Sequence, residues 1–174
     1  MKLLVVVDMQ KDFVDGALGT AEAVSIVPKV RDKILKCRAE GWTVVFTRDT
    51  HTEGYLETQE GKNLPVIHCV KGTPGWEIVS ELPVEDSRIF DKVTFGSMEL
   101  AQYAAGLSTL EEVQLIGLCT DICVISNALL LKAALPEVPI SVDAGCCAGV
   151  TPESHKNALA AMEACQIRIE NAGM

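Results

Sequence analysis

Short apolar runs alternate along this chain with longer segments whose apolar residues recur at helical spacing. The first run, residues 2–8, is almost unbroken aliphatic sequence, which is typical of a strand buried on both faces. Further strands are expected at 42–47, 88–91, 113–117, 138–142 and 166–169. Helices are expected at 28–40, 77–81, 97–106, 121–134 and 152–165. This alternation predicts an α/β fold with a mainly parallel sheet that helices cover on both sides.

The first predicted helix carries the clearest end signals. Pro28 suits an opening turn and Gly41 suits the position just beyond a helix end, so the helix is expected to run from about Pro28 to Glu40. The connection from 49 to 76 is different, because it is polar, contains glycine and shows little regular pattern. Long connections of this kind are often functional.

Length and composition restrict the possible functions. A chain of 174 residues fits a single domain, residues 1–174. The net charge of −9 and the lack of a basic cluster argue against nucleic acid as a partner. The apolar start is too short for a signal peptide, and no stretch approaches the roughly 18 apolar residues that span a membrane. Seven cysteines without regular spacing indicate reduced thiols, so we expect a cytoplasmic protein that handles small molecules.

Several polar residues directly follow predicted strands. In parallel α/β sheets, ligands bind beyond the carboxyl ends of the strands. Asp8, Asp49, Lys92 and the segment 119–123 all occupy such positions. These residues are therefore the first candidates for a functional site.

Cys123 follows a strand and a turn, in the first turn of a predicted helix. The unsatisfied N–H groups and the positive dipole at a helix start favour a thiolate, so a nucleophile is one interpretation. Alternatively, Cys123 is a small buried hydrophobic residue, Asp8 caps a turn and Lys92 is solvated. Together, however, the three residues form a chemical set, because a carboxylate can accept the thiol proton and an ammonium group can stabilise the thiolate.

Three segments carry a family resemblance: Val5–Phe13, Asp91–Ser97 and Gly117–Val124. In order and spacing they resemble the three signatures of the isochorismatase-like cysteine hydrolases. The resemblance implies a Rossmann-like sheet of six strands in a three-layer α/β/α sandwich. It also implies that Asp8 is the base, Lys92 its electrostatic partner and Cys123 the nucleophile. A cis peptide at Leu118–Cys119 is implied too, with the backbone N–H groups of Cys119 and Cys123 forming an oxyanion hole.

A second group of residues resembles the metal site of the nicotinamidase branch of that family. Asp49 and His51 close the second strand, and His68 follows later in the long connection. One carboxylate and two imidazoles suit a divalent metal ion, for which zinc is the first choice and iron or manganese are alternatives. Taken alone, His51 could be a surface residue and His68 a hydrogen-bonded residue at a strand end.

The chain departs from the usual pattern of this branch in the metal loop. A further histidine is normal a few residues after the first, and here three glutamates are available instead. Glu60 is favoured as the substitute ligand because it lies nearest the approach to His68, while Glu57, Glu53 and water remain alternatives.

Three residues are candidates for contact with a planar substrate ring. An aromatic residue is usual before the second metal histidine, and Leu64 stands in this region as an aliphatic replacement. Phe13 and Tyr103 are the aromatic candidates, although Tyr103 could equally pack its own helix. His155, in a predicted helix, is expected to be structural or exposed.

The resemblance implies a metal-dependent amidohydrolase that converts nicotinamide into nicotinate and ammonia through a thioester, without an organic cofactor. The expected partner is a small amide, and self-association into a homo-oligomer is compatible with the sequence. One alternative is a related hydrolase of small amides or carbamoyl compounds. Others are a thiol-based redox or metal-storage protein and a non-catalytic interaction domain on the same fold.

Overall fold

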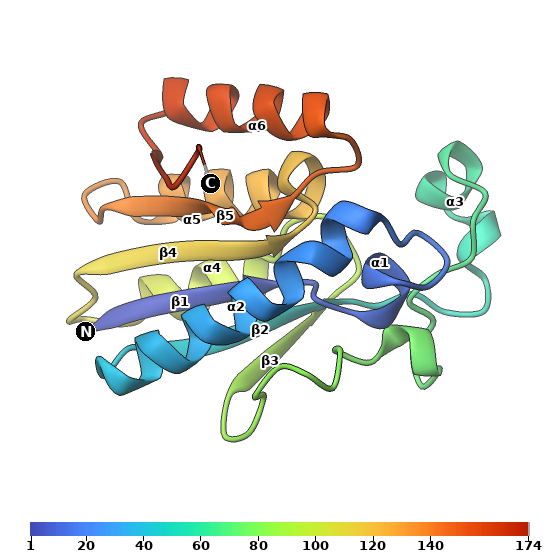
Figure 1. The fold of residues 1–174 in the computed structure, drawn as a ribbon, viewed down its shortest axis with the longest axis horizontal. Coiled ribbons are helices and arrows are strands. Elements are labelled where there is room, and N and C mark those ends of the chain that lie inside the picture. Colours follow the sequence, from blue (N-terminus) through green and yellow to red (C-terminus); the bar gives the residue numbers. More distant parts are fainter. Residues whose placement is uncertain (174) are drawn as a thin grey trace.

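The computed structural model describes residues 1–173 and is built around one sheet of six parallel strands (Figure 1). The strands are β1 (Lys2–Val7), β2 (Thr43–Asp49), β3 (Arg88–Lys92), β4 (Glu112–Leu118), β5 (Ile140–Ala148) and β6 (Arg168–Glu170). Their order in the sheet is β3-β2-β1-β4-β5-β6, and every neighbouring pair is parallel. The predicted α/β class and the six-stranded sheet are confirmed.

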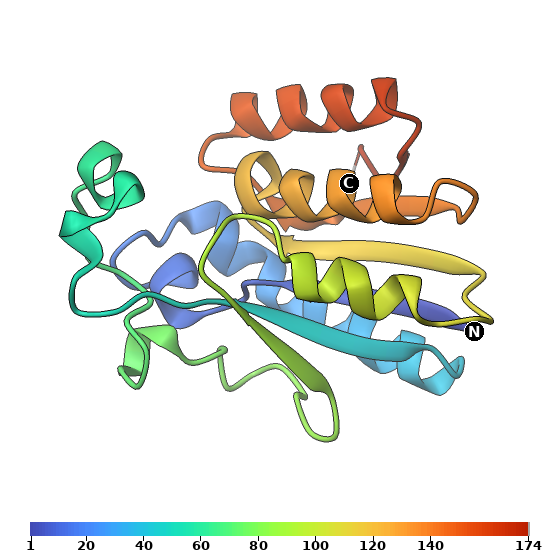
Figure 2. The ribbon, with the colours of Figure 1, turned by 180° about the vertical axis from the view of Figure 1, so that it is seen from behind.

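Each face of the sheet has its own apolar core because successive side chains of a strand point to opposite sides. Leu4 and Val6 of β1 pack with the buried side of α2 (Ala21–Ala39) on one face. Leu3, Val5 and Val7 lie on the other, whose core includes residues of α4 (Met98–Ala105), α5 (Ile125–Ala134) and α6 (Pro152–Ala164). Figures 1 and 2 show this sandwich from its two sides.

The predicted start of the first helix at Pro28 is wrong. α2 begins at Ala21, where the side chain of Thr20 accepts a hydrogen bond of 3.0 Å from the N–H of Ala23. Pro28 lies inside the helix, although proline cannot donate to the helical ladder. The buried face on both sides of Pro28 provides the packing that offsets this loss. Gly41 has the expected place just past the end, with a φ of +80°.

The helix predicted at 77–81 is also absent from the described structure. This segment instead lies against the residues that follow β1, with an antiparallel bridge between Gln10 and Ile78. The N–H of Val79 donates to the carbonyl of Met9 at 2.9 Å. A short 3₁₀ turn, Pro74–Trp76, precedes it. Long-range backbone pairing has therefore replaced the local helix.

Strand β5 also differs from the prediction, which placed it at 138–142. It begins at Ile140 and continues through Ala148, and its pairing with β4 changes register between Leu115 and Gly117. The extension brings residues 144–149 to the carboxyl edge of the sheet, where polar residues of several strands gather. Among the described residues, no helix has the length and apolar character needed to cross a membrane.

Candidate active site and metal centre

Asp8, Lys92 and Cys123 meet at the carboxyl edge of the sheet. Nζ of Lys92 lies 2.6 Å from Oδ2 of Asp8 and 3.4 Å from Sγ of Cys123. Asp8 follows β1, Lys92 ends β3, and Cys123 lies in a π-helical turn, Thr120–Val124, which follows β4. The three residues are 0%, 4% and 5% exposed, respectively. The structure thus brings together the three residues that the sequence singled out.

The carboxylate of Asp8 is held on both sides. Oγ1 of Thr47, on β2, donates a hydrogen bond of 2.6 Å to Oδ1, and Oδ2 faces the ammonium group of Lys92. The backbone of Asp8 adopts a φ of 44°, and its N–H points at the carbonyl of Thr47 at 3.3 Å. Adjacent strands therefore fix the direction of the carboxylate.

Burial decides the protonation of this cluster. It raises the pKa of Asp8 above its ordinary value, although Lys92 and Thr47 act in the opposite direction. Burial and the nearby Asp8 also raise the pKa of the Cys123 thiol well above its ordinary value. The pKa of Lys92 is raised as well, because the attraction of Asp8 outweighs its own burial. The cluster therefore holds a charged Lys92 beside a protonated thiol.

Cys123 does not lie in the first turn of an α-helix, where the sequence pattern placed it. Its turn is π-helical, and the N–H groups of Ile122 and Val124 both donate to the carbonyl of Cys119 at 3.0 Å. Burial raises the pKa of this thiol, so a proton acceptor is required before the sulfur can attack. Asp8 is the carboxylate placed to accept it. The peptide bond between Leu118 and Cys119 is cis, as the family resemblance implied.

A second cluster lies beside the first and contains Asp49, His51, Glu60 and His68. One potential ligand atom from each residue lies within 4.8 Å of the others. Oδ2 of Asp49 is 2.8 Å from Nε2 of His51 and 3.5 Å from Nε2 of His68. Oε1 of Glu60 is 3.6 and 3.8 Å from the same two nitrogens. The cluster includes Glu60, whereas Glu53 and Glu57 are exposed and lie outside it.

The chemistry of these four residues fits a divalent metal ion. Nδ1 of His68 lies 2.7 Å from the carbonyl of Val66 and must donate to it, which directs Nε2 toward the cluster. Oδ1 of Asp49 is buried and makes no hydrogen bond among the described residues. Burial opposes ionisation of Asp49, yet the neighbouring imidazoles of His51 and His68 lower its pKa well below the ordinary value. Asp49 therefore supplies a negative charge between two imidazoles.

Lys92 connects the two clusters. Its Nζ lies 3.5 Å from Oδ1 of Asp49 in addition to its contacts with Asp8 and Cys123. The carbonyl of Thr94 accepts a further hydrogen bond of 3.1 Å from the same nitrogen. One ammonium group is therefore shared by the carboxylate of Asp8, the thiol of Cys123 and the carboxylate of Asp49.

Sequence reasoning did not identify two side chains that hold the metal cluster. Gln10 is fully buried, and its amide accepts from the N–H of Asp49 at 2.7 Å and donates to the carbonyls of Asp49 and Trp76 at 2.8 Å. Oδ2 of Asp12 accepts from the N–H of Cys69, next to His68, at 2.8 Å. Both residues lie in the first family signature. Their polar character just after β1 was the signal that could have identified them.

Cys123 and all four residues of the second cluster line a cavity of about 690 Å³, a size suited to a small molecule. Phe13 and Leu64 line it, as predicted for substrate contacts. Tyr55, which was not predicted, lies behind this lining: its ring centroid is 4.6 Å from that of His51, and its hydroxyl donates a 2.8 Å hydrogen bond to the carbonyl of Leu64. The lining residues that were not predicted as site residues are Leu18, Thr20, Ala23, Thr58, Gln59, Asn63, Val93, Thr94, Phe95, Leu118, Ile122, Gly149 and Val150.

The predicted ring contact of Tyr103 is wrong. Its ring does not line the cavity and packs instead against Phe90, with 5.3 Å between the ring centroids. Arg88 lies over the Tyr103 ring at 4.8 Å. α4 carries Tyr103 along the covered face of the sheet, where its apolar ring contributes to the core.

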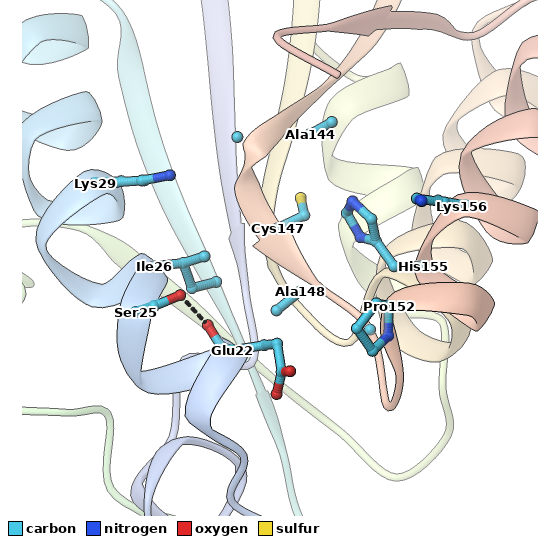
Figure 3. A pocket seen from close by; sticks show the side chains of 12 residues that line it. Glu22, Ser25, Ile26, Lys29, Ala144, Cys147, Ala148, Pro152, His155 and Lys156 are labelled. Carbon is cyan, nitrogen blue, oxygen red and sulfur yellow. Dashed lines mark hydrogen bonds between the residues drawn. The ribbon is translucent and has the colours of Figure 1, made fainter. Parts of the chain in front are cut away.

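A smaller cavity of about 210 Å³ lies between α2 and the start of α6 (Figure 3). His155 lines it, and its Nδ1 is 2.7 Å from Oγ1 of Thr120. Burial lowers the pKa of His155, so the imidazole is neutral at physiological pH. Gly149 lines both cavities. His155 is thus a half-buried residue behind the turn that carries Cys123.

Comparison with known proteins agrees with this geometry. The model of the isochorismatase domain matches residues 2–172. A pyrazinamidase of Pyrococcus horikoshii, whose structure was solved in complex with zinc, has a TM-score of 0.85 and 34% identity, with 97% of each chain covered. The nicotinamidase of Saccharomyces cerevisiae is 25% identical over 74% of this chain and 80% of its own length. An N-carbamoylsarcosine amidase from Thermoplasma acidophilum has a TM-score of 0.77 and 25% identity, covering 99% and 97% of the two chains.

Proposed function

Since the chain belongs to the isochorismatase family of hydrolases, we propose that it is a nicotinamidase that converts nicotinamide into nicotinate and ammonia. One observation carries the proposal: Asp49, His51, Glu60 and His68 line the same cavity as Cys123. An amide hydrolase needs a nucleophile, and a pyridine ring brings a nitrogen that a metal ion can hold. The cavity contains residues suited to both tasks.

The four clustered residues would hold a divalent metal ion, and zinc is the ion that their donor types favour. Two imidazoles with two carboxylates give an approximately neutral site once a divalent ion is bound. Such an ion would supply a Lewis acid that orients a ring nitrogen or a water molecule. The zinc complex of the similar Pyrococcus horikoshii pyrazinamidase supports this choice.

In the proposed first half-reaction, Asp8 accepts the proton of the Cys123 thiol and the sulfur attacks the carboxamide carbon. The electron pair of the carbonyl double bond moves to oxygen, which the N–H groups of Cys119 and Cys123 would stabilise. Asp8 then passes its proton to the departing nitrogen, so ammonia leaves and a thioester remains. The charged Lys92 stabilises both the thiolate and the carboxylate throughout.

In the second half-reaction, Asp8 accepts a proton from water, whose oxygen attacks the thioester carbon. Collapse of this intermediate breaks the carbon–sulfur bond and releases the carboxylic acid, which ionises, while Asp8 returns its proton to the departing sulfur. The aliphatic and aromatic side chains of Leu64 and Phe13 would border the ring and limit the access of other water molecules. No organic cofactor is needed for this sequence of steps.

A second function is favoured by two observations. The metal loop lacks the additional histidine, and the structural likeness extends to the N-carbamoylsarcosine amidase of Thermoplasma acidophilum. A hydrolase of a small carbamoyl compound would use the same Cys123, Asp8 and Lys92. A panel that contains nicotinamide, pyrazinamide, benzamide and N-carbamoylsarcosine separates the two functions, because benzamide has the carboxamide but lacks the ring nitrogen.

Ammonia release from nicotinamide, coupled to glutamate dehydrogenase, tests the proposal directly. The zinc-loaded protein should release ammonia, Cys123→Ala should not, and the exposed Cys165→Ala should match the unmodified protein. Metal-depleted protein should lose turnover and regain it when zinc is added. If nicotinamide is inert while N-carbamoylsarcosine is hydrolysed, the second function replaces the first. Equal turnover of the metal-free protein would remove the metal from the mechanism.

A further inference from the structure

Asn127 is a buried polar residue of α5 that none of the assigned roles uses. It is 1% exposed and lies four residues after Cys123. Its Nδ2 donates to the carbonyl of Cys123 at 2.8 Å and to the carbonyl of Phe95 at 3.2 Å. Its Oδ1 accepts from the N–H of Ser97 at 2.9 Å. A single side chain thus binds the turn of the nucleophile and two points of a distant loop.

That loop, residues 93–97, connects β3 to α4. It contacts Lys92 and also lines the larger cavity. The carbonyl of Thr94 accepts a hydrogen bond from Nζ of Lys92, and Val93, Thr94 and Phe95 line the larger cavity. The loop therefore supports the ammonium group and forms one wall of the cavity. The loop and the turn that carries Cys123 are far apart in the sequence. The position of the loop relative to this turn therefore depends on contacts between the two segments.

The hydrogen-bonding capacity of Asn127 matches this position. An amide can donate two hydrogen bonds and accept others, and three bonds of this kind are present. An aspartate could accept from Ser97 but would set a carboxylate oxygen against two carbonyls. An apolar side chain would leave a buried N–H group and two carbonyls with one partner fewer.

We propose that Asn127 is a positioning residue that fixes Lys92 and the 93–97 wall against Cys123. Its amide joins the nucleophile turn to the loop that holds the ammonium group, so it sets the distance between the thiol and its charged partner. It also holds the wall that any substrate must contact. This role rests on the proposed function only in that Cys123 is the nucleophile.

Ser126 provides a matched control on the same helical turn. Its Oγ donates to the carbonyl of Ile122 at 2.6 Å, a bond to the fourth preceding residue like the one between Asn127 and Cys123. None of its hydrogen bonds reaches the 93–97 loop. Ser126→Ala therefore measures the loss of one hydrogen bond from a side chain of α5 to a preceding carbonyl. It leaves the hydrogen bonds between Asn127 and the 93–97 loop in place.

The experiment compares Asn127→Ala, Asn127→Ser and Ser126→Ala in the zinc-loaded protein. Alkylation of Cys123 by iodoacetamide, followed by mass spectrometry of its peptide, measures thiol reactivity without any amide substrate. We expect Asn127→Ala to slow this alkylation at least fivefold and to lower kcat/KM for nicotinamide about 100-fold, because misplacement of reacting groups has effects of this size. Ser126→Ala should stay within twofold of the unmodified protein in both measurements.

Asn127→Ser separates the hydrogen bond to the carbonyl of Cys123 from the hydrogen bonds to the 93–97 loop. Its hydroxyl can still reach the carbonyl of Cys123 but cannot reach the loop, so KM should rise about tenfold while kcat changes less. This variant also serves if Asn127→Ala does not fold. Alkylation rates of both Asn127 variants within twofold of Ser126→Ala would overturn the proposal, even if their melting temperatures fall. If the unmodified protein does not hydrolyse nicotinamide, the proposed function fails, and the alkylation comparison still decides the role of Asn127.

Discussion

Thr47 donates a hydrogen bond of 2.6 Å to Oδ1 of Asp8, the carboxylate that faces Lys92. This hydrogen bond comes from the neighbouring strand and acts on the charged form of the carboxylate. It lowers the pKa of Asp8, while burial raises it by more. The protonation of the proposed base therefore depends on a hydroxyl group that does not touch the cavity.

Thr47→Val should move the acidic limb of the pH profile upward. Loss of the hydrogen bond raises the pKa of Asp8 further, and Asp8 must be ionised to accept the thiol proton. Activity should therefore be lost at a higher pH on acidification, by about half to one pH unit. The check is kcat/KM measured between pH 4 and 8, with Thr43→Val at the other end of β2 as the control. An acidic limb that does not move would contradict the role of Thr47.

Lys92→Met should lower kcat/KM for the amide by about 100-fold or more and destabilise the fold. Removing one member of a buried ion pair leaves the other charge without compensation, which costs about 3–5 kcal/mol. The double variant Asp8→Asn, Lys92→Met removes both charges and should recover part of the stability without recovering activity. Urea unfolding of the single and double variants measures the difference. Equal stability of the two would argue against the ion pair.

Glu60→Gln should weaken zinc binding at least tenfold, since the variant replaces a charged oxygen of the four-residue cluster with a neutral amide. Glu57→Gln, at an exposed position of the preceding 3₁₀ turn, should bind zinc as the unmodified protein does. Competition with a coloured chelator gives both affinities. If Glu60→Gln retains full affinity, water or another glutamate completes the site.

Gly117→Ala should be far more harmful than Gly41→Ala, although both glycines have positive φ. A Cβ at Gly117 would collide with the backbone of Val7, whereas a Cβ at Gly41 would meet nothing within 4 Å. We expect a loss of about 1 kcal/mol of unfolding free energy at Gly41, from backbone conformation alone, and several times that at Gly117. Because Val7 precedes Asp8, Gly117→Ala should also reduce activity. Chemical denaturation and the ammonia assay together check both expectations.

The sequence was most informative where buried strands end. An unbroken apolar run such as Leu3–Val7 identifies both a central parallel strand and its carboxyl end, and the next residue is then a candidate for the site. This is why Asp8, Lys92 and the segment after β4 could be grouped before their distances were known. Their proximity follows from the parallel arrangement, which places these ends at one edge.

The predictions that proved wrong lie where capping or tertiary contacts outweigh the preference of a single residue. Pro28 is a good first-turn residue in isolation, but the capping Thr20 and the buried face of α2 carry the helix through it. The segment 77–81 pairs with residues after β1, which no local pattern reveals. Tyr103 packs on Phe90, and the sequence did not indicate which side of α4 would face the sheet.

The choice among three glutamates also required tertiary structure. Thr58 caps the short helix α3 (Gln59–Asn63), where its Oγ1 accepts from the N–H of Gly61 at 2.9 Å. Glu60 lies in the first turn of that helix and faces the two imidazoles, while Glu57 belongs to the preceding 3₁₀ turn. The sequence shows the order of these glutamates along the chain. It does not show the change from 3₁₀ turn to helix that directs Glu60 toward the imidazoles.

The shared ammonium group of Lys92 has a consequence for folding. Asp49 and Lys92 end two different strands, Asp8 directly follows a third, and Cys123 lies in the turn after a fourth. No local segment can reproduce their contacts, so catalytic activity should return during refolding only after β1, β2, β3 and β4 have all paired. Recovery of activity in a refolding experiment would thus report the completion of the sheet, and it should lag behind the recovery of helical signal, because non-local pairing is slower than local structure.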